Sequence, residues 1–493
     1  MKRSRLLMIF SVVLTLALLA TPAFAADPNP GSGSADVTVM NADTNTGGAA
    51  STVLAQYYSQ AGTLSNTRQQ NVAPLGSYQF RAADSGLPDN WVGAMVLSAS
   101  TELAAVATIQ WTGGSAGDGV EADSYSGFAS GSSRMNVPFA VYAPNAQYTV
   151  FSVQNTESAT TANITMKYYN RAGNLDATIT DTIPPNGQKM YDLHIPGAKI
   201  PVWGNIPYFQ SNGNWTGALV IETASSDQKV AAVANNFWPR YSVAFNASSR
   251  GARKLFVPSV EHRYSNPNTD NGWLGFSVTI VQNLGTSNTS VTLKYINKDT
   301  QNIDLTLGPI TLGPGVAVGC NTRSGGAGCT AAGTYNTLGA LWAGSVIVES
   351  TSQDVAAISY SIRPRDNEAG AYTGADSSNA GNNTFLSEVY QIGGGGSART
   401  LWSLMRLQNV SSNTATVQVR FINRDGTIVN SATQNITIAG EKSFNFNLRE
   451  DNPINLGGNW SGAVHISSNQ PLAVVVENLW GLSKLAAYNG YSR

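Results

Sequence analysis

Short apolar runs separated by polar turns fill the chain after residue 35. Within the runs, apolar and polar positions tend to alternate, a period of two that is typical of half-buried β-strands. Turn residues recur about every 8 to 12 positions, as in sandwiches of antiparallel sheets. Only the first 25 residues contain a long uninterrupted apolar stretch. The pattern therefore predicts an all-β protein.

One pattern recurs four times along the chain. A Trp-x-Gly sequence is followed by an apolar run, a polar turn and a second apolar run, which predicts a hairpin. The tryptophans lie 124, 127 and 118 residues apart. We call them the anchor tryptophans: Trp91, Trp215, Trp342 and Trp460. We expect them to fill the core, since large aromatic side chains suit the space between two sheets.

A second residue repeats upstream of each hairpin, where a strand ends in asparagine. We call these the anchor asparagines: Asn41, Asn155, Asn283 and Asn409. Asparagine at a strand end fits turn chemistry, because its side chain hydrogen-bonds nearby backbone. An aromatic strand ending in Asn and a Pro/Gly turn follow in most copies. The repeated order predicts four tandem immunoglobulin-like antiparallel β-sandwich domains, at residues 36–134, 135–254, 255–384 and 385–493.

The order of these motifs resembles the tandem sandwich repeats of uncharacterised secreted bacterial surface proteins. The second copy carries it most fully, as Val153-Gln154-Asn155, Tyr168-Tyr169-Asn170, Pro184-Pro185 and Trp215-Thr216-Gly217-Ala218. The resemblance covers nearly the whole chain after the leader. It implies a secreted location and a repeat architecture, and it implies no reaction.

The N-terminus has the pattern of a cleaved secretory signal peptide at residues 1–25. Basic residues at 2–5 precede an apolar run from Leu6 to Ala20 and the small-residue sequence Ala23-Phe24-Ala25. The alternative, a retained membrane anchor, needs about 20 apolar residues. We therefore expect a secreted, extracellular protein that can associate with the cell surface, with no membrane span in the mature chain. A flexible tail follows at residues 26–35.

Two cysteines, Cys320 and Cys329, flank a glycine-rich loop. In an oxidising compartment they predict one disulfide, worth roughly 2 to 3 kcal/mol by loop-closure entropy. A metal site would need further ligands, and no histidine is close in sequence.

Charge excludes one class of partner. The chain has 29 Lys and Arg against 30 Asp and Glu, and removing the three basic residues of the leader leaves 26 against 30, a net charge of −4. Such a chain has no electrostatic reason to bind nucleic acid.

Candidate chemistry is sparse. The three histidines, His194, His262 and His465, occupy non-equivalent positions in different copies. We predict no catalytic residues, no cofactor and no metal site, although residues 266–272 resemble a calcium loop enough to leave a weak surface calcium site open.

Three copies begin with an extra strand that the first copy lacks, which predicts an open sheet edge at one end of the array. We expect a rod of four sandwiches, a non-enzymatic structural or adhesive protein at the cell surface or in a filament. Its partner would be a cell-surface or matrix polymer, or copies of itself. The alternative is an array of glycan-binding modules that uses aromatic residues of variable loops, namely Trp203, Tyr208, Phe209 and Trp273. These loop residues also suit packing against a neighbouring sandwich.

Overall fold

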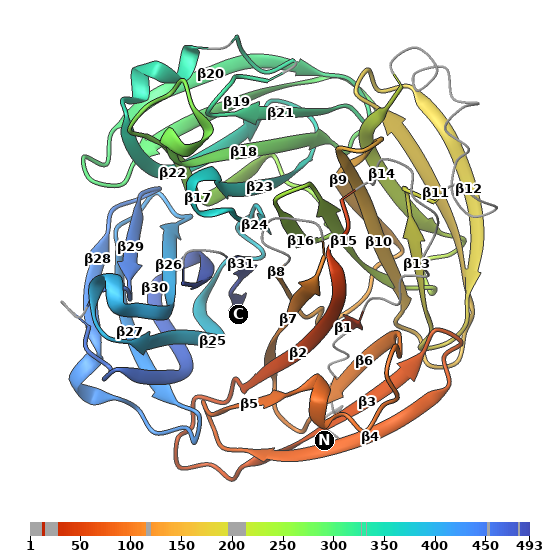
Figure 1. Ribbon diagram of the computed structural model, residues 1–493, viewed down its shortest axis with the longest axis vertical. Coiled ribbons are helices and arrows are strands. Elements are labelled where there is room, and N and C mark those ends of the chain that lie inside the picture. The colour runs from red at the N-terminus through yellow and green to blue at the C-terminus, as the bar shows by residue number, and fades with distance from the viewer. Residues whose placement is uncertain are drawn as a thin grey trace.

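A computed structural model describes residues 28–114, 120–195, 213–326, 328–331, 333–450, 454–481 and 484–493, and the backbone of residues 12–14. In this part of the chain the protein is built almost entirely of antiparallel strands (Figure 1). The helices among the described residues are short 3₁₀ turns: η1 (Ala82–Asp84), η3 (Asp270–Gly272), η4 (Thr334–Leu338), η5 (Pro364–Asp366), η6 (Gly396–Ala398) and η7 (Asn430–Ala432). Among the described residues, no helix is long and apolar enough to cross a membrane.

The strands fall into four consecutive groups, which we call units 1 to 4. Unit 1 contains β1 (Val12–Leu14), β2 (Gly31–Asn41), β3 (Ser51–Ser59), β4 (Leu64–Val72), β5 (Ser77–Phe80), β6 (Gly93–Ser98), β7 (Leu103–Gly113) and β8 (Val120–Ser126). Unit 2 contains β9 (Arg134–Ala143), β10 (Gln147–Asn155), β11 (Ala162–Asn170), β12 (Leu175–Ile183), β13 (Gln188–Asp192), β14 (Trp215–Thr223), β15 (Val230–Phe237) and β16 (Ser242–Asn246).

Units 3 and 4 follow the same plan. Unit 3 contains β17 (Lys254–Tyr264), β18 (Trp273–Asn283), β19 (Thr289–Asn297), β20 (Ile303–Leu312), β21 (Ala317–Asn321), β22 (Leu341–Ser350), β23 (Val355–Arg363) and β24 (Glu368–Thr373). Unit 4 contains β25 (Gly381–Gly393), β26 (Arg399–Asn409), β27 (Ala415–Asn423), β28 (Gln434–Ile438), β29 (Ser443–Asn447), β30 (Asn459–Trp480), β31 (Lys484–Asn489) and β32 (Tyr491–Ser492).

Strand order repeats from unit to unit. Unit 1 has two sheets, in the orders β1-β6-β3-β4 and β5-β2-β7-β8. In unit 2 the corresponding layers, β9-β14-β11-β12 and β13-β10-β15-β16, are joined by pairing between β9 and β10. Unit 3 repeats this order, and in unit 4 the long strand β30 serves both layers.

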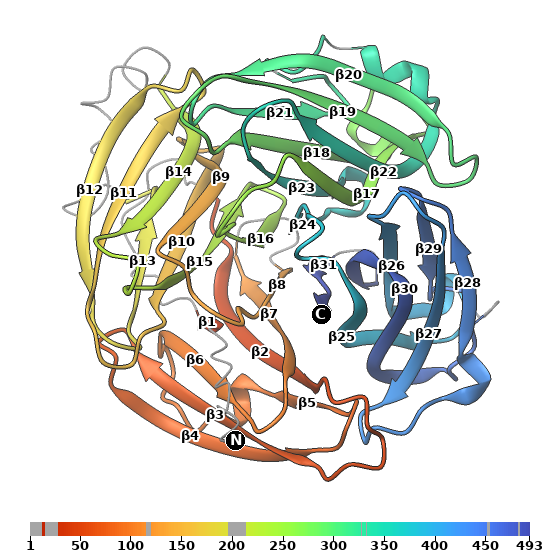
Figure 2. The ribbon, with the colours of Figure 1, turned by 180° about the vertical axis from the view of Figure 1, so that it is seen from behind.

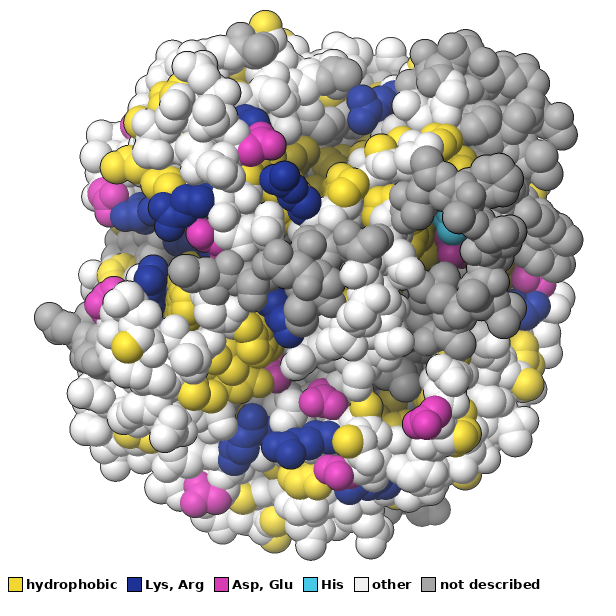
Figure 3. Space-filling view, viewed as in Figure 1, with side chains coloured by type: hydrophobic (Ala, Val, Ile, Leu, Met, Phe, Trp, Pro, Cys, Tyr) yellow, Lys and Arg dark blue, Asp and Glu magenta, His cyan; other side chains and the backbone are white. Residues whose placement is uncertain are grey.

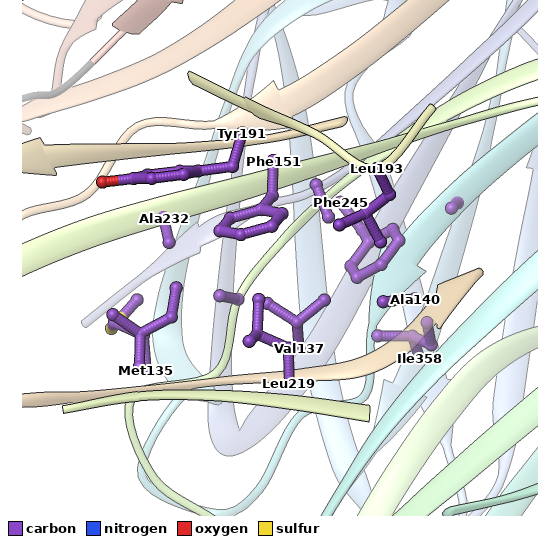
Figure 4. Packing of buried hydrophobic residues seen from close by; sticks show 14 of the residues in the cluster. Met135, Val137, Ala140, Phe151, Tyr191, Leu193, Leu219, Ala232, Phe245 and Ile358 are labelled. Carbon is purple, nitrogen blue, oxygen red and sulfur yellow. The ribbon is translucent and has the colours of Figure 1, made fainter. Parts of the chain in front are cut away.

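Apolar side chains from the two layers meet in the interior of each unit. In unit 2, Met135, Val137 and Leu219 face Phe151 and residues of the other layer (Figure 4). These side chains are at most 1% exposed. Burial of this kind, worth about 25 cal/mol per Å² of apolar surface, is the main stabilising term of such a layered fold.

The four units close into a ring and do not form the rod expected from the sequence. Figures 1 and 2 show the units arranged around a central axis, with the C-terminus near the middle. The last strands, β8, β16, β24 and β31, each contact the next, and β31 contacts β8 again. Near the axis, Asn246 donates to the Ser126 carbonyl (2.7 Å) and Asn489 donates to the Thr373 carbonyl (2.7 Å).

The seam between units 4 and 1 joins residues from opposite ends of the sequence. The buried carboxylate of Glu388 accepts a hydrogen bond from Thr108 (2.7 Å), and the Ser77 amide donates to the Arg424 carbonyl (2.9 Å). A comparable backbone hydrogen bond runs from Gln188 to Gln60 between units 2 and 1 (3.3 Å). Specific hydrogen bonds between units 4 and 1 therefore close the ring.

In the part of the chain that the structure describes, the first unit has only a short opening strand. The opening strands of units 2, 3 and 4 are β9, β17 and β25, and each pairs with the strand that follows its anchor tryptophan. In unit 1 the same position beside β6 holds β1, whose three residues lie within the apolar segment near the N-terminus.

Candidate ligand-binding cleft

A mainly apolar cleft lies between units 2 and 3 and has a volume of about 580 Å³. Small-molecule sites are usually mainly apolar clefts of roughly 300 to 1,000 Å³ with a few polar groups. Its lining comes from β9, the turn after β15, β18, β21, β23 and the loop after β21: Phe139, Gln147, Arg171, Thr216, Gly217, Trp238, Pro239, Arg240, Tyr241, Asp270, Phe276, Val278, Ile280, Ala317, Gly319, Asn321, Arg323, Ser324, Gly325, Gly326, Tyr360, Ile362 and Pro364.

The floor of the cleft is one face of unit 3. Val278 and Ile280 on β18 lie beside Gly319 on β21, and a methyl group on Gly319 would be only in ordinary van der Waals contact with both. Because these side chains are small or aliphatic, they leave the space between the units unfilled. Hydrophobic side chains and Lys or Arg side chains lie side by side in the upper half of Figure 3, where the two units meet.

Aromatic side chains of unit 2 form the opposite wall. Phe139, Trp238 and Tyr241 are half-buried. Both Phe139 and Trp238 contact the edge or face of Tyr360 from unit 3, with ring centroids 5.9 and 5.7 Å apart. Asn236 donates to the Tyr360 hydroxyl (2.6 Å) and so fixes the ring on which the others pack. The cleft therefore offers a preformed aromatic surface.

Three arginines and one carboxylate surround the cleft. Arg171 and Arg240 are exposed, and within the described part of the chain neither forms an ion pair. Arg323 pairs with Asp270 and lies 5.5 Å from the ring centre of Trp273. Burial raises the pKa of Tyr241, so the hydroxyl stays protonated at neutral pH. The local charge favours an anionic ligand, although the chain as a whole is slightly acidic.

The disulfide loop forms part of the cleft wall. Cys320 and Cys329 are bonded, as the sequence predicts. Between them, Asn321 pairs with Gly325, and the Asn321 side chain accepts from the Arg323 amide (2.8 Å). The crosslink thus stabilises the segment that carries Arg323.

The structure places only part of the expected glycan-contact set. Trp203, Tyr208 and Phe209 lie outside the described residues. Trp273 does not lie at the surface, because it is 2% exposed and its indole donates to the Pro267 carbonyl (3.1 Å). It acts as packing beneath Arg323, and in this position it is not a platform for a sugar.

The residues that form the aromatic and basic walls were missed in the sequence. Trp238, Pro239, Arg240 and Tyr241 occupy the turn between β15 and β16. Trp111 and Trp480 occupy the equivalent hairpin position in units 1 and 4, so an aromatic residue there did not mark a cleft. Arg171, directly after the aromatic strand of unit 2, carried no distinguishing signal.

The anchor tryptophans pack against the aromatic strands of their own units. Trp215, Trp342 and Trp460 are 0%, 3% and 7% exposed, whereas Trp91 is half-buried. The glycine of each Trp-x-Gly lies under the indole: a Cβ on Gly217 would meet the Trp215 ring at 2.9 Å. The glycine is therefore needed for close packing.

The anchor asparagines tie a strand end to a neighbouring turn. All four are 0% exposed. Asn155 donates to the Ile183 carbonyl (3.0 Å) and accepts from the Glu157 amide (3.0 Å), and the other three make matching bonds. Loss of such a doubly bonded buried amide leaves backbone groups unpaired.

Titratable side chains elsewhere are held in separate structural contacts. The Nδ1–H group of His262 donates to the Thr322 carbonyl (2.8 Å), and burial lowers the pKa of His262. His465 stacks on Phe385 with ring centroids 4.9 Å apart, and burial lowers its pKa to about 4. His194 lies against Tyr148 in unit 2. The described residues contain no group of three or more His, Cys, Asp or Glu side chains arranged to hold a metal ion.

The loop at residues 266–272 uses its oxygen atoms internally. The side chains of Asn266 and Thr269 accept backbone amides of the same loop, and Asp270 pairs with Arg323.

No protein-family model and no curated protein matches the chain. Among solved structures, it is similar to Thermotoga maritima 1070 at 17% identity, with a TM-score of 0.20, over 23% of this chain and 97% of that one. It is also similar to the Anabaena sensory rhodopsin transducer at 17% identity, with a TM-score of 0.17, over 20% of this chain and 88% of that one. Similarity this low carries no argument about fold or function.

Proposed function

We propose that the protein is a secreted, non-enzymatic binding protein whose four immunoglobulin-like domains hold an acidic saccharide in the cleft between units 2 and 3. The observation that carries the proposal is the aromatic wall of Trp238 and Tyr241 with Arg171 and Arg240 beside it. Aromatic faces suit the apolar faces of sugar rings, and guanidinium groups bind carboxylates or sulfates bidentately.

An acidic polymer of the extracellular matrix or cell surface is the partner that this chemistry fits. The guanidinium groups of Arg171 and Arg240 supply charge, and the aromatic surface supplies contact area without rearrangement. The structural-filament hypothesis has less support, because it rested on an end-to-end rod and the units instead contact one another around an axis. The proposal agrees with the glycan-binding alternative in the kind of ligand, but it assigns the contact to other aromatic residues.

A saccharide array tests the proposal directly. We expect the purified protein to bind uronate-containing or sulfated oligosaccharides and to bind neutral oligosaccharides at least tenfold more weakly. Replacing both guanidinium groups, Arg171→Gln with Arg240→Gln, should abolish this preference. The matched control is Arg250→Gln, an exposed arginine outside the cleft. Equal binding of acidic and neutral saccharides, or no binding to any, would refute the proposal.

A further inference from the structure

Among the described residues, only β1 occupies the opening-strand position of unit 1. β9, β17 and β25 form seven, eight and nine residue pairs with β14, β22 and β30, whereas β1 forms three with β6. β1 has the same register as a full opening strand. Val12 pairs with Met95, and Val137 pairs with Leu219, which is the residue of unit 2 equivalent to Met95. We call the position beside β6 the strand slot.

Other features of unit 1 agree with a missing strand. Trp91 is half-buried, while its three counterparts are at most 7% exposed. A small cavity of about 20 Å³ lies beside it, lined by apolar side chains that include Tyr57, Leu87 and Met95. In unit 2, the residues that correspond to Trp91 and Val92 pair with Tyr142 and Val141 of the opening strand. The first core is therefore underfilled on the side where that strand belongs.

The three complete units define what the slot accepts. Their opening strands bury side chains at positions i, i+2 and i+5, and all are apolar except the first of unit 4: Met135, Val137 and Ala140 in unit 2, Leu255, Val257 and Val260 in unit 3, and Thr384, Leu386 and Val389 in unit 4. Arg134 precedes this pattern and pairs with Glu222, but Ser98 takes the place of Glu222 in unit 1. The slot thus favours an extended, apolar and uncharged segment.

We propose that the strand slot is an acceptor for a β-strand contributed by another polypeptide. β1 pairs with three residues of β6 in it, and the expected cleavage after residue 25 would remove β1 and open the slot. The exposed N–H and C=O groups of β6 would then pair with an extended segment that carries apolar residues at i, i+2 and i+5. This inference concerns unit 1 and is independent of the saccharide cleft.

The donor is not a second copy of this chain folded in the same way. The opening strands of units 2, 3 and 4 are already paired on both layers, and residues 31–41 of the N-terminal stretch pair with β7 as β2. A different protein with a free extended segment is therefore the partner.

A peptide-binding experiment tests the inference. The probe is a fluorescent peptide with the sequence of residues 135–143, Met-Asn-Val-Pro-Phe-Ala-Val-Tyr-Ala. We expect it to bind the protein lacking residues 1–25, and to bind the chain that retains them at least tenfold more weakly. The matched control peptide has Ser at the positions of Met135 and Val137, and it should also bind at least tenfold more weakly.

Hydrogen exchange locates the binding. Amides of β6 should exchange faster when residues 1–25 are absent and should regain protection when the peptide is added. Absence of peptide binding, or binding without protection of β6, would overturn the proposal. Unfolding of the chain that lacks residues 1–25, measured by circular dichroism, would also overturn it, because the slot would then be filled permanently by the protein's own segment.

Discussion

Two neighbouring interfaces of the ring use the same backbone positions in opposite ways. Between units 2 and 3, Trp238 contacts Tyr360 beside Ile280. Equivalent positions in the units can be counted from each anchor asparagine and from the residue that pairs with it. Between units 3 and 4, Arg363 is equivalent to Trp238, Glu477 to Tyr360 and Arg406 to Ile280. The first interface is aromatic and aliphatic, and the second is charged.

The charged interface is closed. Arg363 lies 2.8 Å from Glu477, and Arg406 lies 3.1 Å from Glu261, so each pair joins unit 3 to unit 4. Ser259 at the position of Phe139 also donates to Glu477 (2.7 Å). All four charged side chains are less than 10% exposed. Between units 3 and 4, long paired side chains fill the space that shorter apolar side chains leave open between units 2 and 3. The residue types at a few equivalent positions therefore determine whether an interface is closed or contains a cleft.

Removing one partner of the buried ion pairs should have the largest effect. Arg363→Ala leaves Glu477 and Glu368 without their closest guanidinium, and an uncompensated buried charge costs about 3 to 5 kcal/mol. Urea unfolding should show this loss. The control, Arg250→Ala at the surface, should change the free energy of unfolding by less than about 0.5 kcal/mol. A similar small change for Arg363→Ala would contradict the assigned role of the cluster.

A third interface, between units 1 and 2, adds a pH-dependent contrast. Asp123 accepts from Trp111 (2.6 Å), which is equivalent to Trp238, and from Ser242 of unit 2 (2.9 Å). Burial raises the pKa of Asp123 to about 7, outweighing the hydrogen bonds, which lower it. In the unfolded chain this proton dissociates near pH 4.

The raised pKa means that Asp123 stabilises the folded state at low pH. This contribution should be lost as the pH rises from about 4 to about 7, by on the order of 2 to 4 kcal/mol. The free energy of unfolding at pH 5 minus that at pH 8 should therefore be smaller for Asp123→Asn than for the unmodified protein. Identical differences would show that Asp123 does not titrate in this way.

The pKa of Glu261 in the charged interface is shifted in the opposite direction. Burial raises this pKa, but the charges of Arg363 and Arg406 outweigh burial and lower it.

Exchanging residues between the two interfaces sharpens the comparison. Ile280→Arg places a guanidinium opposite Tyr360, where it has no carboxylate partner, and should destabilise the protein by about 1 to 3 kcal/mol. Adding Tyr360→Glu supplies the partner found at Glu477. The two changes should couple favourably, by about 1 kcal/mol in a double-mutant cycle of unfolding free energies. Strict additivity would show that the positions are not equivalent.

The smallest expected effect concerns one hydrogen bond in the open interface. Tyr360→Phe removes the hydroxyl that accepts from Asn236 and should cost about 1 kcal/mol. The aromatic wall should remain, so saccharide binding should change by less than threefold. Thermal or urea unfolding together with a binding titration separates the two effects, and a large loss of binding without a loss of stability would contradict this assignment.

The sequence pattern predicted what depends on local periodicity. Alternating positions gave the strands, and Cys320 and Cys329 gave the disulfide, because both signals lie within short stretches of chain. Ring closure was not predictable in this way. Contacts such as that between Thr108 and Glu388 join residues 280 positions apart, and strand periodicity contains no information about them.

The cleft residues were hidden for a related reason. An aromatic residue such as Trp238 has the same sequence signature whether its neighbour fills the space beside it or leaves a cleft. Trp273, a candidate contact of the glycan-binding alternative, is 2% exposed because residues of β17 and the disulfide loop cover it. Exposure depends on neighbouring elements, which the local pattern does not define.

Calorimetric titration with an acidic oligosaccharide tests the central claim most directly, by comparing Trp238→Ala with Trp480→Ala. The two tryptophans occupy equivalent hairpin positions in units 2 and 4, and only Trp238 lines the cleft. We predict that Trp238→Ala weakens binding about tenfold, corresponding to about 1.4 kcal/mol, and that Trp480→Ala leaves the affinity unchanged. Unchanged affinity in Trp238→Ala, or an equal loss in both variants, would contradict the assignment of the cleft.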